Sequence, residues 1–201
     1  GRGGGDQTPA AGDDRPRPFQ AIPDKYAKRQ GGINAEGVAA LKQFVQDGGT
    51  IVAIGSSAEG AVQMFGLPLA PQVTVGRTEY YVPGSVLRVS VDAKNPVAHG
   101  YGDTADIFFD NSPVWKVNGT GSDLHSVAWF ANDAPLRSGW AWGQKYLDKG
   151  IEMAEATVGK GRVFLFGNEL LFRSQPHGNF KFFFNALYLS VAPDMKAGLG
   201  Q

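Results

Sequence analysis

The sequence contains no cysteine, and this absence excludes disulfide bonds, thiolate nucleophiles and thiolate metal ligands together. An excess of one charge is also absent, since nineteen Lys and Arg balance nineteen Asp and Glu. Dedicated binding of nucleic acid or of an anionic membrane requires a basic surface, so the balance argues against both partners. No apolar run approaches the roughly 18 residues of a spanning helix, so no membrane span is predicted.

Length and composition predict one folded domain preceded by a tail. The chain has 201 residues, of which 42% are hydrophobic and 19% are charged, which is enough for one sizeable core. Residues 1–18 are mostly Gly, Pro, Asp and Arg. Because they have almost nothing to bury, we expect them to form a disordered tail or linker. Residues 19–201 then form the folded domain.

Hydrophobic periodicity predicts alternating helices and strands. A helix is expected over 35–47, with Val38, Leu41, Phe44 and Val45 on its buried face. The run TIVAI at 50–54 is typical of a strand buried on both faces, as in a parallel sheet. A turn at 55–57 leads into a short helix over 58–65.

The rest of the chain is mainly β-structure. Short strands are predicted at 86–91, 107–109, 114–117 and 126–130, and Gly159-Lys160-Gly161 joins a hairpin of 151–158 and 162–166. A final helix over 179–191 has a predicted buried stripe made of Phe180, Phe183, Phe184, Leu187 and Val191. Together these patterns predict an α/β fold whose mixed, partly parallel sheet is flanked by helices and carries a β-rich insertion.

Four blocks, at 31–59, 82–101, 138–143 and 159–190, follow one another in a familiar order. They resemble the carboxyl-terminal domain of bacterial funnelin-type zinc carboxypeptidase-like proteins, a domain similar to class I glutamine amidotransferases. The resemblance implies a flavodoxin-like or amidotransferase-like fold and a periplasmic or extracellular location. The partner that it implies is an upstream peptidase domain or another subunit, and the parent protein would be of zinc metallocarboxypeptidase type. Domains of this type begin with further strands, so we expect the first strands of the sheet to be lacking.

The residues that the two enzyme families use for chemistry are missing. The amidotransferase resemblance implies a cysteine at the strand-to-helix turn, where Ser57 is the nearest candidate, and a His-x-Glu pair near the carboxyl end, where the chain has His177-Gly178-Asn179. The peptidase resemblance implies a His-x-x-Glu zinc motif, and none of His99, His125 and His177 is followed by Glu at that distance. We therefore expect no metal site, no cofactor in this chain, and a non-catalytic accessory or binding domain, in effect a pseudoenzyme.

Two other functions remain open from the residues. Ser57 and His177 could form a serine hydrolase pair, because an apolar strand, a glycine, a serine and a helix start resemble a nucleophile elbow; alternatively, the serine caps the helix. Arg173, Gln175 and His177 share one loop before a helix and could hold a small anion. The same side chains could equally fix the loop to neighbouring backbone.

Aromatic residues provide a further candidate surface. A sugar- or peptide-binding platform is one interpretation, and packing in the core or at a domain interface is the favoured one. A helix also cannot bury all of 182–184 on one stripe, so one of these three phenylalanines is expected to meet another domain or subunit. The aromatic residues considered are Tyr80, Tyr81, Trp115, Trp129, Trp140 and Trp142.

Overall fold

The computed structural model describes residues 32–119 and 123–192. The chain divides into two units, Gly1–Asn34 and Ala35–Gln201, and every helix and strand described below belongs to the second. The tail predicted at residues 1–18 lies outside the described residues. No helix in the two described ranges is long and apolar enough to cross a membrane.

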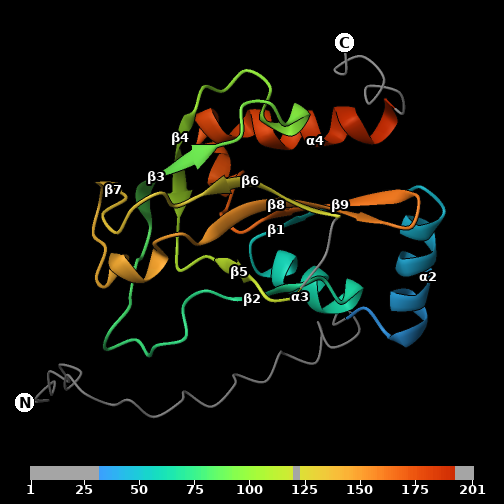
Figure 1. Ribbon diagram of the computed structural model, residues 1–201, viewed down its shortest axis with the longest axis horizontal. Helices are drawn as coiled ribbons and strands as arrows, with labels where there is room; N and C mark the ends of the chain where they lie inside the picture. The colour runs from blue at the N-terminus through green and yellow to red at the C-terminus, as the bar shows by residue number, and fades with distance from the viewer. Residues whose placement is uncertain (1–31, 120–122, 193–201) are drawn as a thin grey trace, which may run out of the picture. The chain divides into compact units, whose positions relative to one another are not determined.

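Three α-helices and nine strands make up the described part of the fold (Figure 1). The helices are α2 (Ala35–Gln46), α3 (Ser56–Phe65) and α4 (Phe180–Val191), with short 3-10 turns η1 (Pro96–Ala98), η2 (Gln144–Leu147), η3 (Phe172–Ser174) and η4 (His177–Asn179). The strands are β1 (Thr50–Ile54), β2 (Leu69–Pro71), β3 (Ser85–Val91), β4 (Thr104–Phe109), β5 (Trp115–Val117), β6 (Leu124–Trp129), β7 (Leu136–Ser138), β8 (Ile151–Val158) and β9 (Gly161–Phe166).

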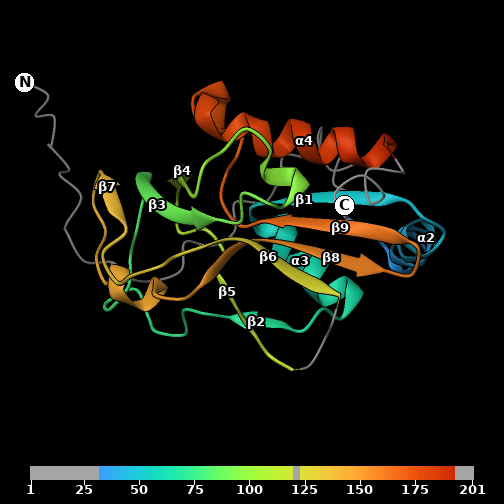
Figure 2. The ribbon, with the colours of Figure 1, turned by 45° about the horizontal axis from the view of Figure 1, so that its top comes forward.

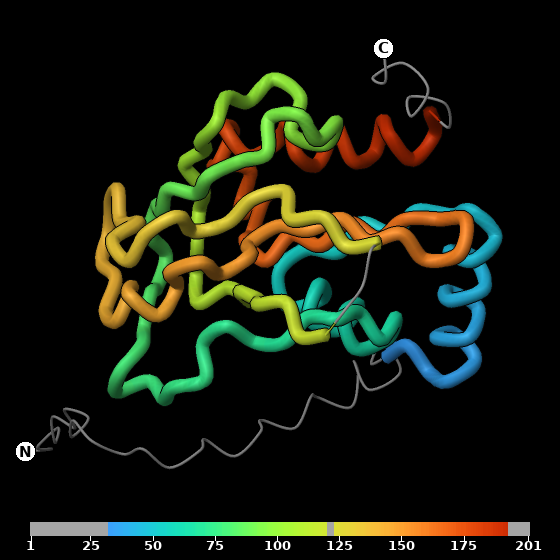
Figure 3. The backbone as a smooth tube through the Cα atoms, viewed as in Figure 1, coloured from blue at the N-terminus to red at the C-terminus, as the bar shows by residue number. Residues whose placement is uncertain are grey.

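The nine strands form one mixed sheet, which confirms the predicted fold class. The main strand order is β1-β9-β8-β6-β3-β4, and only β1 and β9 run parallel among the described pairs. Figure 3 shows β1, from early in the chain, beside the much later β9. The predicted β-rich insertion does not stand apart from the sheet, because β3, β4 and β6 extend it through antiparallel pairing.

Helices cover both faces of the sheet. In β9 the side chains alternate, so Phe164 and Phe166 belong to one core and Val163 and Leu165 to the other. The first core is closed by α4, and the second by α2 and α3. Figure 2 shows α4 and α3 on opposite sides of the β1–β9 region. Burial on both faces explains why β9 is a continuous apolar run.

The predicted buried stripe of α4 is wrong. The buried residues of this helix are Phe182, Ala186 and Leu189, whereas Phe184, one member of the predicted stripe, is 56% exposed. Apolar residues lie on most sides of this helix, so helical periodicity is satisfied by more than one stripe. Contacts with the sheet therefore determine which stripe of α4 is buried.

The predicted buried face of α2 is also wrong in part. Val45 is buried, but Phe44 is 52% exposed, and its ring lies against Gly49 at the end of the helix. The strand that follows, β1, pairs with β9 alone among the described residues. Its other edge therefore carries backbone groups that point toward no strand within 32–119 or 123–192.

Candidate site at the carboxyl edge of the sheet

The turn that follows β1 is built around a glycine rather than a serine. Gly55 has φ 59° and ψ −135°, a conformation that L side chains rarely adopt. Its N–H donates to the carbonyl of Phe166 at 2.8 Å, which fixes the turn to the end of β9. A Cβ at this position would overlap the carboxylate of Glu169. The strained position of this strand-to-helix turn therefore has no side chain.

Ser57 lies one residue into α3 and is exposed. The N-cap of the helix is Gly55, and no side chain caps this helix end. The alternative in which the serine caps its helix is therefore wrong. The reason is the position of the helix start, because α3 begins at Ser56 and not at Ala58 as the sequence indicates.

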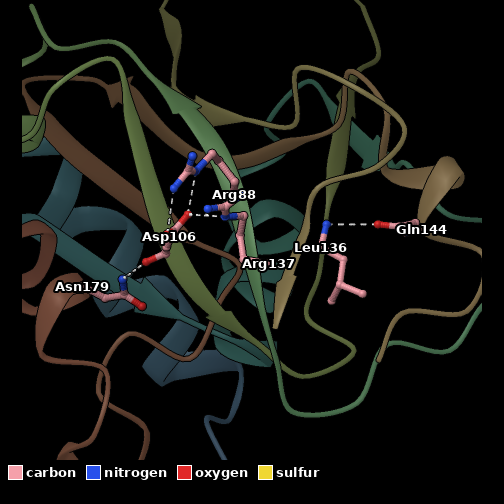
Figure 4. A network of polar contacts seen from close by, with 6 residues as sticks. All are labelled: Arg88, Asp106, Leu136, Arg137, Gln144 and Asn179. Atoms are coloured by element: carbon pink, nitrogen blue, oxygen red, sulfur yellow. Dashed lines mark hydrogen bonds and ion pairs between the residues drawn. The ribbon is translucent and has the colours of Figure 1, made fainter. Parts of the chain in front are cut away.

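His177 belongs to a loop that is attached to β4, at the opposite end of the main strand order from β1. Its ring is exposed and contacts Phe180 at 5.2 Å between centroids. Two residues later, Asn179 is buried and binds β4 twice. Its Nδ2 donates to Asp106 O at 2.8 Å (Figure 4), and its Oδ1 accepts from Phe108 N at 3.1 Å. Because β4 and β1 lie at opposite ends of the main strand order, this attachment separates the His177 loop from the Ser57 turn.

No hydrogen bond joins Ser57 to His177 in the part of the chain that the structure describes. A serine nucleophile requires a base within about 3 Å of its hydroxyl, or modestly farther in an unliganded enzyme. The two candidate residues are not brought together as such a pair.

The strand to which Asn179 attaches is itself held by a charged network. The guanidinium of Arg88 on β3 donates to the carboxylate of Asp106 at 2.8 and 3.0 Å, and Arg137 on β7 lies 3.9 Å from it (Figure 4). Hydrogen bonding from Arg88 lowers the pKa of Asp106. All three side chains are well exposed, so the network contributes little to stability.

Arg173 and Gln175 are exposed on the same loop as His177. The guanidinium of Arg173 lies over the ring of Phe172 at 5.0 Å, and that ring stacks on Phe108 of β4 at 4.4 Å. Arg173 itself has φ 47°, so the loop is tightly bent. Anion binding by these residues stays a prediction.

Sequence reasoning missed a cluster of buried polar groups near the end of β9. Glu152 and Asn168 are fully buried, and no described residue hydrogen-bonds their side chains or the hydroxyl of Tyr80. The N–H of Gly167, the residue before Asn168, donates to the carbonyl of Glu152 at 2.8 Å. This bond places Glu152 close to Asn168. The signal in the sequence was a charged residue near the start of a strand whose neighbours are apolar.

Burial dominates the electrostatics of this cluster. Desolvation raises the pKa of Glu152 well above its ordinary value. Burial, and secondarily the charge of Glu152, raises the pKa of Tyr80. A carboxyl that remains protonated donates a hydrogen bond through its hydroxyl and accepts one through its carbonyl oxygen.

A cavity of about 260 Å³ lies next to the cluster. Tyr80 lines it, and so do Pro113, whose carbonyl lies against Gly167, and Glu59 from the first turn of α3. Its lining contains no Lys, Arg or His. The cavity therefore disfavours anions and suits a neutral or cationic group. Among the described residues, no group of three or more His, Asp or Glu side chains could hold a metal ion.

Comparisons with known proteins bear on the fold. No family model matches the sequence, and no curated protein matches it either. Among solved structures, a ThuA-like protein from Bacteroides uniformis has a TM-score of 0.52 and 12% identity, over 83% of this chain and 68% of that chain. A protein named as a GMP synthase component, from Thermoplasma acidophilum, has a TM-score of 0.45 and 12% identity, over 78% of this chain and 65% of that chain.

A β-galactosidase from Bacillus circulans sp. alkalophilus also matches, with a TM-score of 0.49 and 11% identity. The match covers 78% of this chain but only 20% of the β-galactosidase. At identities this low, the likeness to the ThuA-like protein shows a shared fold and no shared activity. The described part of this chain accordingly shares the α/β fold of the ThuA-like protein.

Proposed function

We propose that this chain is a non-catalytic accessory or binding domain of a zinc carboxypeptidase-like exoprotein, located in the periplasm or outside the cell. The observation that carries the non-catalytic part is the turn after β1. Gly55 occupies its strained position, and the carboxylate of Glu169 lies where a side chain at that position would be. The order of the four sequence blocks supports the carboxypeptidase context.

The chemistry of acyl transfer supports the same proposal. A nucleophile at the turn requires a reactive side chain and a hydrogen-bonded base, and glycine supplies no side chain. A developing oxyanion also requires donors or positive charge around it. The carboxylate of Glu169 beside the amino terminus of α3 would repel such a charge. The turn thus keeps the geometry of the fold without a reacting group.

An exposed apolar stripe on α4 supports an accessory role. Phe184, Leu187, Tyr188 and Val191 are between 42% and 78% exposed, and their spacing places them on one side of the helix. Burying such a stripe against another folded domain would recover the free energy lost by exposing it. The occupant we propose is the upstream peptidase domain.

A covalent probe tests the absence of hydrolase chemistry. We expect a fluorophosphonate probe to label this chain no more than the Ser57→Ala variant, because Ser57 has no hydrogen-bonded base among the described residues. Ser56→Ala, one residue earlier in the same exposed turn, is the matched control. Labelling that is lost in Ser57→Ala but kept in Ser56→Ala would establish the serine hydrolase alternative instead.

Hydrogen exchange tests the proposed partner. Amides of α4 are expected to exchange more slowly in the longer parent protein than in this chain alone, because a docked domain excludes water from the stripe. Equal exchange in both would contradict docking on α4. Slower exchange that appears in this chain alone at high concentration would identify a second copy as the occupant.

The third function, a small-anion module, is tested by calorimetry with phosphate and simple carboxylates. A heat of anion binding that disappears in Arg173→Ala would favour the small-anion module over the accessory role. Lys42→Ala serves as the control, because Lys42 is an exposed cation on α2, which covers the opposite face of the sheet from α4.

A further inference from the structure

Two tryptophans are exposed on the segment that follows β7. Trp115 is buried, as the packing interpretation predicts, but Trp140 is 54% and Trp142 is 53% exposed. Their ring centroids lie 6.4 Å apart, with the planes inclined by 17°. Core packing does not account for this pair. Exposed aromatic surface that is gathered in one place is typical of an interaction site.

The backbone holds this aromatic pair in place. Tyr81 and Trp142 form an antiparallel bridge in which each N–H donates to the other carbonyl at 3.0 Å. The ring of Tyr81 meets that of Trp140 edge to face at 6.0 Å, and Trp142 Nε1 donates to Thr78 O at 3.0 Å. The indoles are thus fixed before any ligand arrives, which lowers the entropy cost of binding.

A cavity of about 460 Å³ opens beside Trp142. Its polar side chains come from Thr78, Glu79, Asp133, Gln144 and Lys145, and Tyr146 adds a second aromatic ring. The Tyr146 hydroxyl donates to Glu79 Oε2 at 3.0 Å.

Gln144 is held in the same way. Its Oε1 accepts from Leu136 N at 3.0 Å (Figure 4), and its Nε2 amide hydrogens can then serve as donors to a ligand. Fixed aromatic surface with a few placed polar groups is the usual composition of a small-molecule site.

We propose that this cavity and the adjoining indoles bind a neutral oligosaccharide. A pyranose presents an apolar C–H face, which suits the flat face of Trp142, and a rim of hydroxyl groups. The carboxylates of Glu79 and Asp133 accept hydrogen bonds from hydroxyl groups, while Gln144 and Lys145 donate to them. The site thus offers both donors and acceptors around an aromatic surface.

Other ligand classes fit less well. Phosphate-bearing ligands would meet two carboxylates and a single lysine in the cavity lining, a balance that repels anions. A wholly apolar ligand would desolvate those carboxylates without pairing them. The proposal uses residues distinct from Gly55 and from the α4 stripe, so it does not depend on the accessory role.

Calorimetric titration of the whole chain tests the inference, with neutral oligosaccharides of glucose, mannose, xylose and N-acetylglucosamine as probes. We expect at least one series to bind and to change the indole fluorescence. Trp142→Ala is expected to weaken that binding by about tenfold or more, since the stacking surface is lost. Phe44→Ala, which removes an exposed aromatic ring on α2, should leave the affinity unchanged.

A second variant, Asp133→Asn, shows whether binding can be weakened without a folding defect of the kind that Trp142→Ala could cause. Asp133 is exposed, so its substitution should leave the melting temperature unchanged while it weakens saccharide binding. The inference is overturned if none of the four series binds. Binding that survives both Trp142→Ala and Asp133→Asn would also overturn it, as would a site that takes a lysine-rich peptide and no saccharide.

Discussion

The buried carboxyl of Glu152 makes the stability of this protein depend on pH in a direction opposite to that of a paired surface acid. Burial raises its pKa well above the ordinary value of 4.5. Between that value and the raised pKa, the unfolded chain has released a proton that the folded chain still holds. Stability is therefore complete below about pH 4.5 and falls as the pH rises toward the folded pKa.

The magnitude follows from linkage. Each pH unit in this window costs about 1.4 kcal/mol of unfolding free energy. The loss grows with pH until the raised pKa of the folded state has been passed, and it is constant beyond that point. Glu152→Gln has nearly the same shape but cannot ionise, so it escapes this loss. The variant should match the natural protein in mild acid, and its excess in unfolding free energy should grow by about 1.4 kcal/mol per pH unit as the pH rises toward the folded pKa.

Urea unfolding followed by tryptophan fluorescence, repeated across this pH range, measures the difference directly. Glu36→Gln is the control, because Glu36 is an exposed acid in the first turn of α2. A difference between Glu152→Gln and the natural protein that does not change with pH would refute the reasoning. So would a variant that is less stable at neutral pH, since that would mean the carboxylate is ionised and paired in the folded state.

Two further predictions concern the turn and the last helix. Gly55→Ala should lower the unfolding free energy by about 1–3 kcal/mol, because of a strained φ and an overlap with Glu169. Adding Glu169→Ala should recover only the part of this loss that is due to the overlap. No loss of stability in the single variant would contradict this account. Phe182→Ala should cost about 3–5 kcal/mol because its ring is buried. Phe184→Ala should change stability by less than about 0.5 kcal/mol, and equal losses at the two positions in the same urea assay would show that the burial pattern of α4 is wrong.

Local patterns predicted the elements well where short-range physics decides them. β1 begins and ends at the residues that its apolar run indicates, and Gly159 allows the tight turn between β8 and β9 with φ 61°. The glycine after β1 also marked the turn correctly. The sequence could not say which residue of that turn is strained, because this depends on the bond from Gly55 N to Phe166 O. That bond joins two strands more than a hundred residues apart in the chain.

The sequence by itself determined the class of fold, since apolar periodicity and turn residues are local properties that specify helices and strands. Only the tertiary structure decided which stripe of α4 faces the sheet, because several stripes satisfy the helical period. It also decided that Trp140 and Trp142 stay exposed while Trp115 is buried. Finally, it gathered Tyr80, Glu152 and Asn168 at one sheet edge, since strand pairing brings together residues that no spacing in the sequence connects.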